Sequence, residues 1–121
     1  MRMSTSPPKS RASPFEFRTE TLDDATIVRC SGHLTFDVSA HFKVELRRLI
    51  PQTKRMVIDS TDLDYMDSSG LGAVMSLYVS ARKAGCEFHL INFNQRVRQL
   101  LEMTNVISIF ETCGKSMIKL P

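Results

Sequence analysis

The feature that most constrains the fold of this chain is the junction at residues 65–72, between an apolar run and an amphipathic one. Residues 56–59 form a short run that is rich in β-branched side chains, as in a buried strand. After the junction, apolar side chains recur at spacings of three and four, which is typical of one face of a helix. These side chains are Leu71, Val74, Met75 and Tyr78. The sequence therefore predicts a strand that is followed directly by a helix.

Two adjacent serines, Ser68 and Ser69, follow Asp67 at the predicted start of this helix. A side-chain oxygen there can accept a hydrogen bond from the free N–H groups of the first turn, and the same N–H groups favour a phosphate on a hydroxyl. Gly70 and Gly72 each cost about 1 kcal/mol relative to alanine inside a helix. Two glycines in one turn therefore suggest a bare surface that another backbone can approach closely. Helix capping alone explains one serine and the aspartate, but not the whole group.

Short strands and helices alternate along the rest of the chain. Strands are predicted at residues 15–21, 26–34 (with a bulge at Gly32), 54–60, 86–91 and 108–111. Helices are predicted at 37–50 with Asp37 as its cap, at 69–84 ended by Gly85, after a cap at Asn94, and at 114–118. This order predicts a two-layer α/β fold, with helices packed on a mixed sheet of four or five strands. The junction then lies at the carboxyl end of a central strand, where open α/β sheets place their ligand or partner contacts.

Composition restricts the domain organisation and the kind of partner. A length of 121 residues corresponds to one domain that is long enough to bury a core. Residues 1–14 are rich in serine, proline and basic side chains, so we expect a disordered tail there and a single domain over 15–121. The tail holds three basic residues and no acid, which accounts for the whole net charge of +3. The remainder is neutral and does not resemble a nucleic-acid-binding face.

Cysteine usage and hydropathy indicate the compartment. Three cysteines at irregular positions argue against a disulfide framework and fit a reducing cytoplasm. No window approaches the ~18 uninterrupted apolar residues of a membrane helix. The polar N-terminus also lacks the apolar segment of a secretory signal. We therefore expect a cytoplasmic protein without membrane insertion.

A serine hydrolase is the first enzyme to consider, because its nucleophile also lies on a strand-to-helix turn. That turn requires Gly-x-Ser-x-Gly, whereas Met66 stands two residues before Ser68 and Asp67 two before Ser69. His89 is a possible base, but it falls in an alternating strand, and the chain is short for a hydrolase sheet. We therefore expect no catalytic residues.

Metal and nucleotide sites are also tested by spacing. The acids between Asp59 and Asp67 do not match a calcium loop, and we expect Asp62 and Asp64 to lie in a solvated loop. The pairs Cys30/His33 and Cys86/His89 are three residues apart in predicted strands, so that the members of each pair would point to opposite faces. No glycine-rich nucleotide motif is present. We therefore expect no metal and no cofactor.

The run Met-Asp-Ser-Ser-Gly-Leu-Gly at 66–72 resembles the signature of the STAS domain in anti-sigma factor antagonists (anti-anti-sigma factors), and the similarity extends from about Ile27 to about Glu111. In that family a partner kinase phosphorylates the serine directly after the aspartate, which here is Ser68. The resemblance implies the STAS fold and a bacterial partner-switching protein that regulates transcription. Unphosphorylated, it would bind an anti-sigma factor that is also a serine kinase and so release a sigma factor. Phosphorylation of Ser68 would inactivate it, and a serine phosphatase would reset it. The implied partner-binding residues are Asp67, Ser68, Ser69, Gly70, Leu71 and Gly72.

Two departures from the family pattern leave an alternative open. In many members the second strand ends in Gly-Glu-Leu-Asp, followed by Thr-Ala, whereas residues 32–39 read Gly-His-Leu-Thr-Phe-Asp-Val-Ser. Thr35 thus replaces the acid that normally lies near the phosphorylation site, and Val38 stands where a threonine is usual. The pattern Gly-x-Leu-x-Phe is similar to STAS modules attached to anion transporters. The alternative role is a STAS subunit of a membrane transporter or another signalling assembly.

Overall fold

The structure, a computed structural model, describes residues 14–114. Its strands are β2 (Glu16–Leu22), β3 (Ala25–Leu34), β4 (Arg55–Met66) and β5 (Glu87–Ile91). Its helices are α1 (Phe36–Leu49), α2 (Ser68–Ala84), α3 (Gln95–Met103) and α4 (Ile107–Gly114), with a short 3-10 turn at Ile50–Gln52. The predicted tail, residues 1–14, lies outside the described residues except for Pro14.

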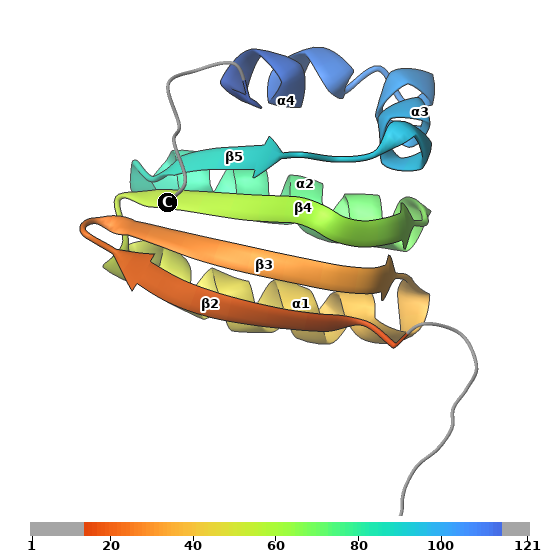
Figure 1. The fold of residues 1–121 in the computed structure, drawn as a ribbon. Helices are drawn as coiled ribbons and strands as arrows, with labels where there is room; N and C mark the ends of the chain where they lie inside the picture. Colours follow the sequence, from red (N-terminus) through yellow and green to blue (C-terminus); the bar gives the residue numbers. More distant parts are fainter. Residues whose placement is uncertain (1–13, 115–121) are drawn as a thin grey trace, which may run out of the picture.

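The four strands form one mixed sheet in the order β2-β3-β4-β5. β2 runs antiparallel to β3, and β3, β4 and β5 are parallel to one another (Figure 1). β4 is therefore a central strand, and its carboxyl end leads directly into α2. This confirms the predicted α/β architecture with a mixed sheet.

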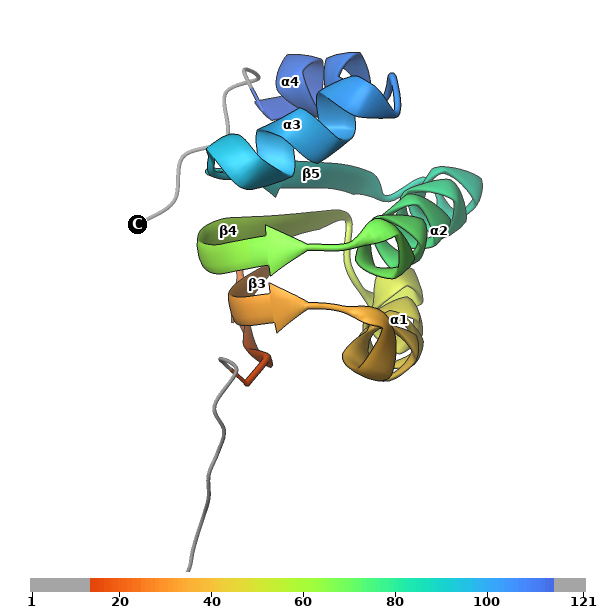
Figure 2. The ribbon, with the colours of Figure 1, turned by 90° about the vertical axis from the view of Figure 1, so that its right-hand side faces the viewer.

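The helices pack in two places. α1 and α2 lie side by side on one face of the sheet, whereas α4 packs on the β5 edge and α3, beside α4, contacts β4 (Figures 1 and 2). The main core lies between the sheet and the first pair, where Phe42 of α1 and Leu77 of α2 are fully buried against Met56 and Ile58. Alternate residues of the strands thus meet the helices, as the strand period requires.

Local signals in the sequence explain the end of α2, the start of α3 and a bulge in β3. Gly85 follows α2 with φ +73°, the left-handed conformation that glycine adopts without steric cost. The Asn94 side chain accepts a hydrogen bond from Val97 N–H at 2.9 Å and caps α3. Gly32 has φ +92° where the pairing register of β3 and β4 shifts, as expected for a bulge.

Three sequence predictions were wrong or incomplete. The predicted strand at 108–111 lies within α4, where Phe110 packs on Phe88 of β5 and Tyr78 of α2. The prediction failed because the periodicity of so short an apolar run cannot distinguish a strand from a buried helix. The predicted final helix lies almost entirely outside the described residues. β4 continues past residue 60 to Met66 because it stays paired with β3, so that Asp62 and Asp64 are exposed but lie in a strand rather than a loop.

Candidate functional site

The junction after β4 places Ser68 as the first residue of α2, with its side chain exposed to solvent. Asp67 precedes it in an extended conformation as the N-cap residue. The start of α1 lies beside it, because β3 and β4 are parallel neighbours and each leads into a helix at its carboxyl end. The candidate site is therefore this pair of helix starts, which we call the helix-start corner: Thr35, Phe36 and residues 67–72.

The Asp67 carboxylate connects the two helices. Its Oδ1 accepts a hydrogen bond from Gly70 N–H at 2.9 Å, and its Oδ2 accepts one from Phe36 N–H at 3.0 Å. The Asp67 N–H in turn donates to the carbonyl oxygen of Leu34 at 3.2 Å. One side chain thus satisfies free N–H groups in the first turns of both α1 and α2.

This arrangement corrects the predicted start of α1. The N-cap position of α1 is Thr35, and Asp37 lies inside the first turn. The Thr35 hydroxyl donates to the Asp37 carboxylate at 2.6 Å and makes no capping bond. The cap is supplied instead by Asp67, from a distant part of the sequence.

The charge of Asp67 is not neutralised by a neighbouring cation. Within residues 14–114, Asp67 takes part in no ion pair. A phosphate on Ser68 would gain from the positive end of the 17-residue helix α2 but would stand beside this carboxylate. Phosphorylation would therefore produce a strongly anionic spot on an exposed corner.

The two glycines of this turn have different environments. Gly70 is buried, and a Cβ at this position would lie 2.3 Å from the Leu34 carbonyl oxygen, so the glycine permits α2 to pack closely on the end of β3. Gly72 is exposed, and a Cβ there would meet nothing within 4 Å. Only Gly72 therefore provides the bare surface that the sequence suggests for both.

The six residues of the predicted docking turn also differ in accessibility. Ser68 and Gly72 are exposed, Asp67 and Ser69 are half-buried, and Gly70 and Leu71 are buried. A partner approaching the helix-start corner would meet the first four directly, whereas the last two support them from below.

Sequence reasoning missed one residue of the corner. Phe36 is 78% exposed although it is the first residue of α1 and its N–H is bound by Asp67. A large apolar side chain at a helix start, outside the buried stripe, is the signal that was available in the sequence. Through its backbone bond to Asp67, Phe36 adds an exposed aromatic residue to the helix-start corner.

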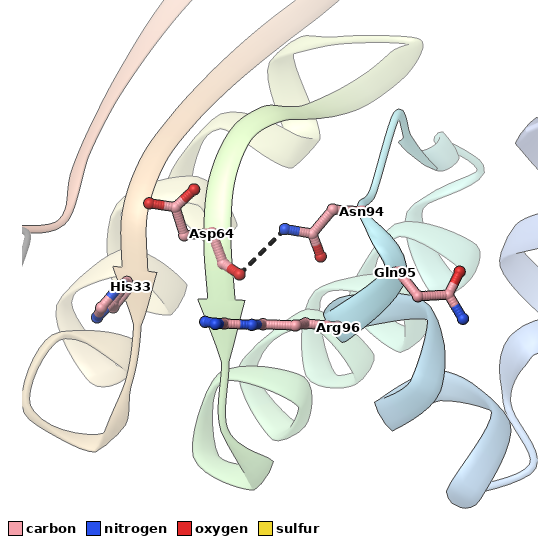
Figure 3. A pocket seen from close by; sticks show the side chains of 5 residues that line it. All are labelled: His33, Asp64, Asn94, Gln95 and Arg96. Carbon is pink, nitrogen blue, oxygen red and sulfur yellow. Dashed lines mark hydrogen bonds between the residues drawn. The ribbon is translucent and has the colours of Figure 1, made fainter.

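A polar pocket lies at the same carboxyl end of the sheet. It is lined by His33, Asp64, Asn94, Gln95 and Arg96, which come from β3, β4 and the start of α3 (Figure 3). The Asn94 amide donates to the carbonyl oxygens of Leu63 and Asp64, at 3.2 and 3.0 Å, and ties α3 to the end of β4. Arg96 points from α3 toward the end of β4 (Figure 3). The pocket adds basic and acidic side chains to this end of the molecule.

The alternative chemistries do not assemble at the corner. His89 lies opposite Val57, near the start of β4, whereas Ser68 follows the far end of that strand, about 30 Å away at ~3.3 Å per residue. Burial raises the pKa of Cys30 to about 12 and also raises the pKa of Cys86, so both side chains remain thiols. Among residues 14–114, no cluster of three or more His, Cys, Asp or Glu side chains could hold a metal ion.

In the part of the chain that the structure describes, no helix is both long and apolar enough to cross a membrane.

Comparison with known proteins agrees with this geometry. The family model described as the STAS domain matches residues 16–117. The anti-sigma F factor antagonist of Paenibacillus polymyxa is 32% identical over 85 residues, which cover 69% of this chain and 73% of that protein. The chain therefore belongs to the STAS domain family, as the resemblance at residues 66–72 predicts.

Solved structures show the same fold. The crystal structure of an anti-sigma factor antagonist from Mycobacterium paratuberculosis matches with a TM-score of 0.74 at 17% identity, over 84% of this chain and 87% of that chain. The anti-sigma factor antagonist SpoIIAA in its unphosphorylated form matches with a TM-score of 0.70 at 19% identity, over 77% and 84%. The Bacillus cell fate determinant SpoIIAA in its phosphorylated form matches with a TM-score of 0.66 at 17% identity, over 78% and 87%.

Proposed function

We propose that this protein is an anti-sigma factor antagonist that is switched off by phosphorylation of Ser68. The observation that carries the proposal is the position of this hydroxyl, exposed at the start of α2 and directly after the capping carboxylate of Asp67. Two further facts support it: a relative that is 32% identical carries the name anti-sigma F factor antagonist, and SpoIIAA has been solved in both unphosphorylated and phosphorylated forms.

In the unphosphorylated state, the helix-start corner binds an anti-sigma factor that is also a serine kinase, and the sigma factor is released. The contact surface consists of the exposed part of the turn (Asp67, Ser68, Ser69 and Gly72), with Gly70 and Leu71 beneath it. Phe36 adds an apolar anchor, because an exposed aromatic ring that becomes buried in a partner contributes strongly to binding. The bare backbone at Gly72 allows the partner to approach closely.

The kinase then transfers a phosphate to Ser68, which adds about −1.5 to −2 charges at neutral pH. Inside an interface, this charge is costly to remove from water unless a cation pairs with it. The Asp67 carboxylate adds negative charge beside the phosphate instead of neutralising it. The complex dissociates because the interface loses affinity, and the domain itself keeps its fold. A serine phosphatase restores the hydroxyl. This protein is a binding partner throughout and catalyses none of these steps, which take place in the cytoplasm.

The test is phosphorylation by the cognate anti-sigma factor kinase with ATP, followed by mass spectrometry of the peptides. We expect one phosphate, on Ser68, and none on the Ser68→Ala variant. Ser69→Ala is the matched control, since it removes the neighbouring half-buried hydroxyl and leaves Ser68 in place. A phosphate found on Ser69 or in residues 1–13, with Ser68→Ala still modified, would contradict the proposal.

A pull-down with the kinase measures the second half of the switch. Ser68→Ala keeps the interaction before and after ATP is added, whereas Ser68→Asp loses it in both cases. The same experiment from whole cells tests the alternative role, since a membrane permease in place of a small kinase among the partners would indicate a STAS subunit of a transporter.

A further inference from the structure

β2 is an edge strand of the sheet, and within residues 14–114 its outer side pairs with no other strand. At the opposite edge, α4 packs on β5 (Figure 1). The side chains of residues 18–21 are exposed along β2. A proline or a bulge commonly protects such an edge from pairing with another chain. β2 reads Glu-Phe-Arg-Thr-Glu-Thr-Leu and pairs with β3 without a register shift, so it has neither protection.

The hairpin between β2 and β3 decides which backbone groups of β2 point outward. Leu22 and Ala25 close the short loop at 23–24, so they form a pair that exchanges both backbone hydrogen bonds. Hydrogen-bonded and non-hydrogen-bonded pairs then alternate along the two strands. The N–H and C=O groups that point to the open edge therefore belong to alternate residues. These residues are Phe17, Thr19 and Thr21.

Arg18 is the charged residue of this edge that lacks a counter-ion. Its partner on β3 is Arg29, so two positive side chains lie directly opposite each other. Arg29 bonds to Glu20 at 2.9 Å and to Asp59 at 2.9 Å. Arg18 takes part in no ion pair within residues 14–114. A carboxylate placed at the open edge beside Arg18 would therefore be favourable.

We propose that a second copy of this chain pairs with the β2 edge, with the two β2 strands antiparallel and centred on Thr19. Thr19 is the middle residue of β2, so this register overlaps the entire strand. It places Arg18 of each copy opposite Glu20 of the other copy. The sheets of the two copies then form one continuous sheet, and each Arg18 gains a carboxylate.

Other symmetric registers fit the strand less well. Because the outward-pointing residues alternate, the two-fold axis must pass at a residue and not between two residues. An axis at Arg18 or at Glu20 would set that residue against its own copy, and like charges directly opposite each other are destabilising. An axis at Phe17 would overlap only residues 16–18 of β2. The axis at Thr19 satisfies both the charges and the length.

An apolar contact on the α1 side of the sheet supports the same register. Phe17 is half-buried and lines a pocket beside α1, together with Phe15 and Val38. In the proposed register, Thr21 of the second copy lies directly opposite Phe17. An aromatic ring beside a β-branched side chain is a favourable cross-strand pair. Pairing along β2 would therefore cover part of this pocket as well as the open backbone.

Sedimentation velocity of the full chain over a concentration series tests the proposal. The wild type should form a reversible dimer. Arg18→Glu and Glu20→Arg each create like-charged pairs at both symmetric positions, so each should raise the dimer Kd at least about tenfold. An equimolar mixture of these two variants should return the Kd to within about threefold of the wild type, because every cross-strand pair of the mixed dimer again joins opposite charges.

Glu16→Arg is the matched control. It makes the same charge change on the same strand, but it lies opposite the uncharged Leu22 of the second copy, so the Kd should stay within about threefold of the wild type. Thr19→Pro tests the backbone without changing a charge. It removes the central outward N–H and should abolish the dimer, whereas the Tm of the monomer should change little, because an edge strand tolerates proline where the N–H faces solvent.

Two results would overturn the proposal. The first is a wild type that remains monomeric up to millimolar concentration. The second is a dimer that withstands Arg18→Glu, Glu20→Arg and Thr19→Pro, or that Glu16→Arg weakens as strongly as Arg18→Glu does, since the contact would then use another surface or another register. The measurement uses the protein without the kinase, so its failure would leave the proposed phosphorylation of Ser68 unaffected.

Discussion

Asp59 within β4 and Asp67 directly after it each accept several hydrogen bonds, but those of Asp59 come mostly from side chains and those of Asp67 from backbone N–H groups alone. Asp59 is buried and accepts from Thr61 N–H at 3.1 Å, from the Thr61 hydroxyl at 2.6 Å, from Asn92 at 3.2 Å and from Arg29 at 2.9 Å. Asp67 is half-buried and accepts from two backbone N–H groups, at the starts of α1 and α2.

The difference separates a structural carboxylate from one at the proposed docking surface. Arg29 neutralises Asp59 inside the domain, and the surrounding side chains fix its position. Asp67 is half-buried, caps two helix starts and takes part in no ion pair among residues 14–114, directly before the exposed Ser68. In the proposed switch, Asp59 stabilises the fold, whereas Asp67 would repel a phosphate on Ser68. The following predictions test this comparison, beginning with the largest effect.

Removing the Asp59 carboxylate should destabilise the fold most. Asp59→Ala leaves several donors without their acceptor, and breaking such a buried pair costs about 3 kcal/mol, at the lower end of the usual range because Arg29 keeps Glu20. Urea unfolding measures the free energy of unfolding. Asp64→Ala is the control, since that side chain is exposed on the same strand and its loss should change stability by less than about 0.5 kcal/mol. Equal losses in the free energy of unfolding for Asp59→Ala and Asp64→Ala would show that Asp59 stabilises the fold no more than an exposed carboxylate does.

Removing the ring of Phe36 should weaken the partner complex without affecting the fold. An aromatic anchor that becomes buried in an interface contributes about 2 kcal/mol, so Phe36→Ala should raise the Kd for the anti-sigma factor kinase about 30-fold. Isothermal titration calorimetry gives this value. Val79→Ala, which trims an exposed apolar side chain further along α2, should bind like the wild type. Unchanged binding by Phe36→Ala would limit the docking surface to the turn after Asp67.

Removing the Asp67 carboxylate should loosen both helix starts. Asp67→Ala should lower the free energy of unfolding by about 1–2 kcal/mol, the usual cost of a lost N-cap. Asp67→Asn keeps one carbonyl acceptor and should lose less. Amide NMR distinguishes shared from single capping, because the resonances of both Gly70 and Phe36 should move in Asp67→Ala. A Phe36 amide that does not move would show that the carboxylate caps α2 only.

Acid should release part of the Asp59 contribution. Burial alone would raise the pKa of Asp59, but the hydrogen bonds from Thr61 and Asn92 and the charge of Arg29 lower it below its usual value. A carboxyl group whose pKa is lowered by folding stabilises the fold above its unfolded pKa of about 3.9, and this contribution is lost as the pH falls through the folded pKa. Urea midpoints measured between about pH 6 and pH 2 should therefore fall less steeply in Asp59→Asn than in the wild type.

Filling the bare position at Gly72 should have the smallest effect. Gly72→Ala adds a methyl group in open space and should stabilise α2 by up to about 1 kcal/mol through helix propensity. Gly70→Ala is the contrasting variant and should destabilise, because its Cβ would meet the Leu34 carbonyl oxygen. Thermal unfolding shows whether Tm rises in Gly72→Ala and falls in Gly70→Ala. A stabilised Gly70→Ala would show that the helix-start corner can move apart at little cost.

Sequence reasoning succeeded where the cause of a structure is local. The caps of α2 and α3 and the glycine that ends α2 are set by residues within four positions of the helix ends, and the structure confirms them. The parallel strands also follow from short apolar runs between helices. The exposed position of Ser68 follows from the same local pattern.

The features that were missed depend on contacts between distant segments. The cap of α1 comes from Asp67, thirty-one residues after Phe36, so a local search found Asp37 instead. Gly70 is buried because the end of β3 lies against it, which no spacing within residues 66–72 reveals. The apolar run at 108–111 forms part of a helix because the β5 edge offers aromatic rings to pack on.

The close approach at Gly32 has a practical consequence for experiments. A Cβ at Gly32 would lie 2.0 Å from the carbonyl oxygen of Pro14, so the polypeptide enters the domain against the carboxyl end of β3. An affinity tag or fluorophore attached ahead of Pro14 would therefore be tethered at the same end of the sheet as Ser68 (Figure 1). The hairpin turn at Asp23 lies at the opposite end, so a label placed there would lie far from Ser68.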